Sequence, residues 1–164
     1  MLQQMDLWLS AQGIGSWWRG IRPLEEFKSV DGLPFVFMLT FGMPAEELYR
    51  KDLSEFRRKP LSKITDITGM ERILEAVRLA PSAIDRQPWY ITGDTHSLRL
   101  FGKKDGVIIK MMLKNLLYID VGIALCHLWL AAVKENRFLA FEHEVNLKGI
   151  AGKYEYIWTA HLNS

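Results

Sequence analysis

The chain has 164 residues, of which 49% are hydrophobic, 12% aromatic and 24% charged, and its formal net charge is +2. This composition predicts a soluble globular domain with one sizeable core and excludes a disordered chain. The small net charge argues against nucleic-acid binding, because domains that bind phosphate backbones usually concentrate basic residues on one face.

The first forty residues are predicted to form a helix, a loop and a strand. Apolar residues recur on one helical face over residues 2–11, and this helix stops at Gly13. Residues 13–20 contain three glycines and two tryptophans and are interpreted as a loop, and residues 23–32 as a polar surface helix or loop. The continuous apolar run at residues 35–41 is typical of a strand that is covered on both faces.

The middle of the chain predicts a helix, a polar turn and a β-hairpin. Apolar residues recur at helical spacing over residues 70–80, and Pro81 ends this helix. Aromatic, β-branched and other apolar residues at 89–92 and 97–101 favour two strands that form a hairpin around Gly93.

The last third is predicted to contain the longest helix and two strands. Residues 108–117 are interpreted as a helix or a loop that enters one. Residues 119–135 are apolar almost all round, so we expect a central helix that is buried on most sides. Residues 138–144 and 154–162 are strand-like.

Secretion and membrane insertion are not expected. The N-terminus carries Asp6 and no basic region ahead of its apolar residues, unlike a secretory signal. The apolar run at 119–133 is shorter than the ~20 residues of a membrane span and is interrupted by Asp120 and His127. The single cysteine, Cys126, is interpreted as a buried, inert thiol in a reducing compartment. We therefore expect a cytoplasmic protein.

Isolated polar residues do not predict a catalytic or metal site. His127 and His161 each lie in an apolar element without a partner at ligand spacing, so they are interpreted as structural histidines. The basic run at 57–59 is interpreted either as a phosphate contact or as part of a solvated, charged face.

An internal comparison suggests a repeat. Residues 5–11 align with 126–132, and the same offset aligns residues 35–37 with 156–158 without a gap. The comparison predicts that residues 1–63 are the later part of a first half-domain, with its N-terminal part absent, and that residues 64–164 are a second half-domain. The two halves are expected to form one compact domain. The alternative to a repeat is that these short apolar segments are similar by chance.

Four segments resemble motifs of one enzyme family. Residues 80–89, APSAIDRQPW, resemble the A-P-S-x-x-N-x-Q-P-W turn of nitroreductase-like flavin enzymes. In the family's order, residues 10–18 resemble its S-A-Q-G-x-G-x-x-W segment, residues 57–60 its R-K-P-like segment, and residues 120–124 its D-x-G-I-A helix. The resemblance implies an α+β nitroreductase-like fold, in which a mixed or antiparallel sheet packs with a long buried central helix. The chain is similar to the later two-thirds of a single-chain member with two related halves.

What the resemblance implies is an FMN-dependent oxidoreductase, a flavoprotein that takes electrons from NADH or NADPH and reduces a nitro compound or quinone. Family members are usually homodimers. The implied cofactor-binding residues are Pro81, Ser82, Ala83 and Asp85 in the turn, Trp18, Arg19 and Gly20 on the other side of the flavin ring, and Arg57 and Arg58 at the phosphate. No catalytic side chain is implied, because the flavin supplies the redox chemistry.

Two departures from the family pattern leave a second interpretation open. The family's basic R-x-S segment has no counterpart in the sequence. Asp85 replaces the family's asparagine, so an ionised carboxylate that cannot donate stands in place of an amide that can, with Arg86 as the neighbouring cation. The alternative is a degenerate flavin-fold protein that binds no FMN and acts as an interaction module, with Trp17 and Trp18 in a protein contact.

Overall fold

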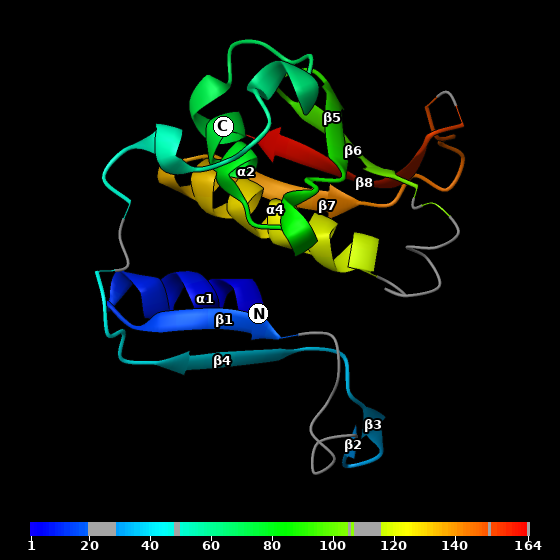
Figure 1. The fold of residues 1–164 in the computed structure, drawn as a ribbon. Helices are drawn as coiled ribbons and strands as arrows, with labels where there is room; N and C mark the ends of the chain where they lie inside the picture. The colour runs from blue at the N-terminus through cyan, green and yellow to red at the C-terminus, as the bar shows by residue number, and fades with distance from the viewer. Residues whose placement is uncertain (20–28, 48–49, 105, 107–115, 151, 164) are drawn as a thin grey trace. The chain divides into compact units, whose positions relative to one another are not determined.

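The structure is a computed structural model that describes residues 1–19, 29–47, 50–104, 106, 116–150 and 152–163 (Figure 1). The chain divides into two compact units, Met1–Glu55 and Phe56–Ser164, which are described separately below. The predicted division into half-domains at residue 63 stays a prediction.

The first unit contains one helix and two small antiparallel sheets. Helix α1 (Leu2–Ala11) has the predicted bounds, and strand β1 (Gly15–Arg19) pairs with β4 (Met38–Gly42). Strands β2 (Ser29–Val30) and β3 (Leu33–Pro34) form a tight hairpin, and a 3₁₀ turn, η2, spans Leu53–Glu55. The hairpin turn has left-handed backbone at Asp31 (φ 50°) and Gly32 (φ 78°), which suits a two-residue connection.

Three sequence predictions for this unit need correction. Residues 13–20, expected to be a loop, contain β1, and the part of 23–32 that the structure describes begins a hairpin instead of a helix or loop. The strand expected at 35–41 begins only at Met38 and is not covered on both faces, because Phe41 is 64% exposed. Among the described residues, β4 pairs with β1 and contacts α1, and a two-stranded sheet under one short helix cannot bury both faces.

The second unit is an α+β layer structure with the predicted antiparallel sheet. Its strands are β5 (Trp89–Gly93), β6 (Ser97–Lys103), β7 (Phe138–Glu142) and β8 (Tyr154–Asn163), in the order β5-β6-β8-β7 with every pair antiparallel (Figure 1). The helices are α2 (Glu71–Leu79) and α4 (Leu116–Lys134), with 3₁₀ turns η3 (Leu61–Lys63) and η4 (Ala83–Asp85). The predicted hairpin around Gly93 and the predicted strands at 138–144 and 154–162 are present.

The long central helix is confirmed. Helix α4 packs against α2 and against strands β5, β6 and β7, and it carries the fully buried Val121, Ala124, Leu128 and Ala132. The described part of the helix begins at Leu116, three residues earlier than predicted. The expected helix or loop at 108–117 lies largely outside the described residues.

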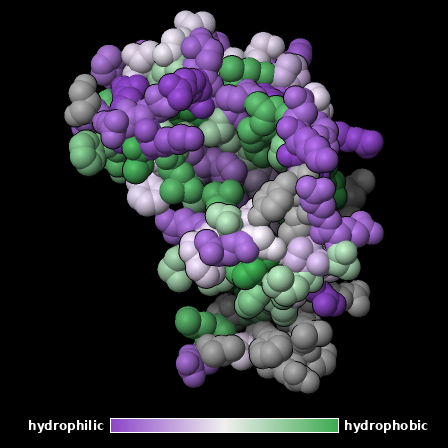
Figure 2. All heavy atoms as spheres, turned by 90° about the vertical axis from the view of Figure 1, so that its left-hand side faces the viewer, coloured by the Kyte–Doolittle hydropathy of each residue, from purple (hydrophilic) through white to green (hydrophobic). Residues whose placement is uncertain are grey.

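By length and composition α4 would also qualify as a membrane span, although a core helix of a soluble protein meets the same criterion. In this structure α4 contacts α2 and the sheet, which is the position of a core helix. On the face drawn in Figure 2, hydrophilic and hydrophobic residues are interspersed over the surface.

Candidate functional site

The family-like turn follows helix α2 and has an unusual backbone. Helix α2 ends at Leu79, and the backbone of Ala80 is extended (φ −53°, ψ 134°). Ala80 precedes Pro81, and a residue before a proline disfavours the helical conformation. Left-handed backbone then occurs at three residues other than glycine: Ile84 (φ 47°), Asp85 (φ 54°) and Gln87 (φ 44°). Ile84 is β-branched and 80% exposed, so its own packing does not stabilise this conformation. Such strained residues persist only where the surroundings hold them, and they cluster at functional sites.

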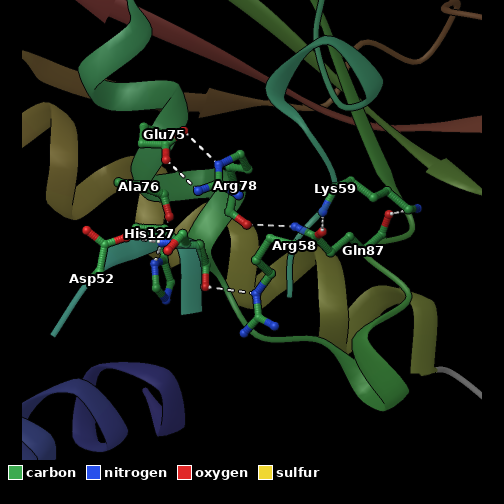
Figure 3. A network of polar contacts seen from close by, with 10 residues as sticks. Asp52, Arg58, Lys59, Glu75, Ala76, Arg78, Gln87 and His127 are labelled. Atoms are coloured by element: carbon green, nitrogen blue, oxygen red, sulfur yellow. Dashed lines mark hydrogen bonds and ion pairs between the residues drawn. The ribbon is translucent and has the colours of Figure 1, made fainter. Parts of the chain in front are cut away.

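Gln87 is the residue that ties this turn to its surroundings (Figure 3). Its buried amide accepts a hydrogen bond from the Lys59 backbone N–H at 2.6 Å and donates one to the Arg78 carbonyl oxygen at 2.6 Å. Its own backbone N–H donates to Ser82 Oγ at 2.8 Å. One side chain therefore joins the segment after the first unit, the end of α2 and the turn.

Asp120 of α4 holds the turn from the other side. Its carboxylate accepts the Ala83 backbone N–H on Oδ1 at 2.9 Å, and its Oδ2 lies 3.2 Å from Arg86 Nη2. The Asp120 residue is only 1% exposed, so this charge depends on these partners for its stability. Arg86 is therefore paired with Asp120.

Asp85 has a different cation as its partner. Arg58 Nη1 lies 2.5 Å from Asp85 Oδ1, and Arg58 Nε donates to the Leu79 carbonyl oxygen at 3.3 Å. Arg86, which follows Asp85 in the sequence, forms an ion pair with Asp120. The segment that carries Arg58 thus contacts both ends of the turn.

Cations concentrate beside the turn. Lys59 Nζ donates to the backbone oxygens of Arg86 at 2.6 Å and Gln87 at 2.9 Å. Burial lowers the pKa of Lys59, and the nearby positive charges of Lys103 and Arg86 lower it further. Arg57, in the same basic run, is exposed. Ammonium and guanidinium donors beside a strained turn suit an anionic ligand such as a phosphate ester, so these residues fit a phosphate-bearing flavin.

The remaining predicted site residues lie in the first unit. Trp18 and Arg19 are on β1, and the ring of Trp18 packs edge-on against Phe37 with a centroid distance of 5.4 Å. Gly20 lies outside the described residues. The turn residues Pro81, Ser82, Ala83 and Asp85 therefore lie with Arg58 in the second unit, whereas Trp18 and Arg19 are described with the first.

Sequence reasoning did not assign Gln87, Lys59 or Asp120 to the site. Gln87 and Asp120 are buried in the structure, and a buried polar group requires a partner. In the sequence, Asp120 gives a signal because it interrupts an apolar run, whereas Gln87 follows Asp85 and Arg86 and gives none.

His127 and His161 each contact a protein partner, and Cys126, expected to be buried, is only partly buried. His127 Nδ1 lies 3.1 Å from the Ala76 carbonyl oxygen (Figure 3), and His161 Nε2 lies 3.2 Å from Glu142 Oε2. Burial raises the pKa of the Cys126 thiol, which lowers its thiolate content. In the part of the chain that the structure describes, no group of three or more His, Cys, Asp or Glu residues could hold a metal ion.

Comparisons with known proteins bear on the family and the fold of the chain. The model of the family described as "Putative TM nitroreductase" matches residues 1–132. The crystal structure of a "putative nitroreductase" from Thermotoga maritima MSB8 is similar at 23% identity with a TM-score of 0.64, a similarity that shows the fold. The match covers 99% of this chain and 62% of that one, so this chain spans less than two thirds of its length. No curated protein matches the chain.

Proposed function

The chain belongs to the "Putative TM nitroreductase" family, and from this membership we propose that it binds FMN and acts as an NAD(P)H-dependent nitroreductase. The family and the α+β fold both agree with the sequence predictions. The observation that carries the proposal is the strained turn at residues 82–87, which hydrogen bonds from three other segments hold beside a cluster of cations. Bound FMN would supply the redox chemistry, passing electrons from NADH or NADPH to a nitro compound or quinone.

The turn would contact the flavin ring. Ser82 Oγ accepts the Gln87 N–H, so its own hydroxyl proton remains to donate to a ring acceptor. The Ala83 N–H is used by Asp120, so Ala83 and Pro81 would contribute packing.

Arginines would hold the phosphate. Arg58 uses its Nε on a carbonyl and one Nη1 bond on Asp85, while a guanidinium has five N–H donors in all. Asp85 is 57% exposed on its side chain, so a phosphate that competes for Arg58 meets little packing resistance there. Arg57 would add a second, exposed cation. The protein would work as a cytoplasmic homodimer.

The first experiment is a titration of purified protein with FMN, followed by quenching of flavin fluorescence. Saturable quenching and a spectrum that bleaches with NADH or NADPH are expected. Asp85→Asn is expected to tighten FMN binding, because it removes a negative charge and frees Arg58 from its ion pair. Asp31→Asn, at another left-handed residue in the first unit, is the matched control. Equal affinities of the wild type and the Asp85 variant would remove the role given to Asp85.

A second candidate function is an interaction module that binds no FMN. The observation that favours it is that the turn's polar groups already satisfy one another, since Asp120 takes the Ala83 N–H and Arg58 takes the Asp85 carboxylate. A colourless protein that leaves the fluorescence of added FMN unchanged would establish this candidate over the nitroreductase.

A further inference from the structure

Beyond the residues assigned by motif, we infer that Asp120 is a positioning residue that fixes the flavin-binding turn, an inference that rests on the proposed function. Asp120 lies on α4, and its two carboxylate oxygens contact residues at both ends of one short arc, Ala83 and Arg86. Two of the three left-handed residues of the turn, Ile84 and Asp85, lie between these contact points. A single buried group therefore closes the arc that contains the strain.

The physical reason is that this backbone does not hold itself. Left-handed backbone is unfavourable for residues other than glycine and persists only when neighbouring groups determine the conformation. A carboxylate suits the task because it can accept at both oxygens at once, with the strength of charge-assisted hydrogen bonds. An asparagine keeps one acceptor for the Ala83 N–H and turns an NH₂ group toward the Arg86 guanidinium, so two donors then face each other.

A positioning role and a purely electrostatic role of Asp120 predict changes of opposite sign in the FMN affinity of Asp120→Asn. Asp120→Asn makes the site more positive by one charge, which on electrostatic grounds alone would tighten the binding of anionic FMN. If Asp120 acts by fixing the turn, the same change weakens FMN binding in spite of the added positive charge. The sign of the change in affinity is thus the decisive observation.

The experiment compares Asp120→Asn with Glu144→Gln in FMN titrations of the full chain. Glu144 is the matched control, since it lies in the same unit and its Oε1 lies 3.5 Å from Arg99 Nε. We expect the dissociation constant for FMN to rise about tenfold in Asp120→Asn, the effect of losing roughly one charge-assisted contact. Glu144→Gln is expected to stay within about twofold of the wild type. An unchanged or tighter affinity in Asp120→Asn would overturn the inference.

Amide hydrogen exchange gives a readout that does not need the cofactor. The peptide that spans residues 80–89 is expected to exchange faster in Asp120→Asn than in Glu144→Gln or the wild type, because the Arg86 side chain loses its anchor and the hydrogen bond of the Ala83 N–H loses its charged acceptor. If the wild type binds no FMN, the proposed function fails while exchange still decides the role of Asp120: equal exchange in both variants refutes it. If Asp120→Asn does not fold, Arg86→Gln replaces it in the exchange measurement, with the same two outcomes.

Discussion

Replacing Gln87 by alanine tests whether the buried amide holds the site together. The change removes two side-chain hydrogen bonds, to the Lys59 N–H and to the Arg78 carbonyl oxygen, each 2.6 Å long. Leaving a buried donor or acceptor without its partner costs about 1–3 kcal/mol, and both groups are only partly buried. We therefore expect Gln87→Ala to lower the free energy of unfolding by about 2–4 kcal/mol, measured by urea denaturation at pH 7.

Gln4→Ala is the matched control for this measurement, because Gln4 is exposed on α1 and the same atoms are removed there. Its effect is expected to stay within about 0.5 kcal/mol, as for most surface substitutions. If Gln87→Ala also changed the stability by less than this amount, the network around Gln87 would not be what fixes the turn, and the reasoning about the site would be refuted.

Three further predictions concern single residues of the second unit. Gly93→Ala is expected to destabilise the fold by at least about 2 kcal/mol, since the φ of Gly93 is 126° and a Cβ would lie 2.1 Å from the Ser97 carbonyl oxygen. Gly122→Ala, on the open surface of a helix, is expected to stabilise the fold by about 0.5–1 kcal/mol. Thermal unfolding of both variants checks that the two changes in stability have opposite signs. Hydrogen bonds from two backbone N–H groups lower the pKa of Asp94 in the folded state below the ordinary value of 3.8. The contribution of Asp94 to the free energy of unfolding is therefore complete above pH 3.8 and is lost as the pH falls through the folded-state pKa. The difference in stability between the wild type and Asp94→Ala should shrink between pH 7 and pH 3 in urea titrations. The Cys126 thiol, with its pKa raised by burial, should react with a thiol reagent at pH 8 more slowly than free cysteine does, and an equal rate would contradict this environment.

The elements that local patterns specify were predictable from the sequence. The helical period over residues 70–80 and the stop at Pro81 gave α2 within one residue at each end. The hairpin of β5 and β6 follows from two apolar runs around Gly93, whose backbone only glycine adopts readily. In each case, contacts within about a dozen residues determine the structure, so a single sequence contains the information.

The polar partners of the site were not predictable in the same way. Asp120 meets Ala83 and Arg86 across more than thirty residues of chain, and Arg58 meets Asp85 across a similar separation. The rule that a buried polar group needs a partner says that Asp120 must have one, but it does not say which. Four cations and two carboxylates can pair in several ways, and only the packing of α4 and of the segment around Arg58 selects one.

The internal repeat stays a prediction, and the two helices that it aligns, α1 and α4, can be compared in three dimensions. Both α1 and α4 end with equivalent hydrogen bonds: Ile14 N–H donates to the Leu9 carbonyl as Arg137 N–H donates to that of Ala132. The cap residue is left-handed in both, Gly13 (φ 75°) and Asn136 (φ 56°), and these two residue types adopt that conformation most readily. A five-residue strand follows each helix and pairs with a later antiparallel strand, β1 with β4 and β7 with β8.

The structural correspondence differs from the sequence correspondence by two residues in the helix. The hydrogen bonds match Leu9 with Ala132, whereas the aligned sequence words match Ala11 with Ala132. In the second strand of each pair the two correspondences agree, because the registers place Gly42 and Asn163 opposite the first residues of β1 and β7. The connection between β1 and its partner residues in β4 is therefore two residues longer than the connection between β7 and its partner residues in β8. Helix caps and strand register thus give both segments a common helix–strand–strand geometry, although the two alignments of the helices differ by two residues. The backbone hydrogen bonds that build this geometry depend on few side chains.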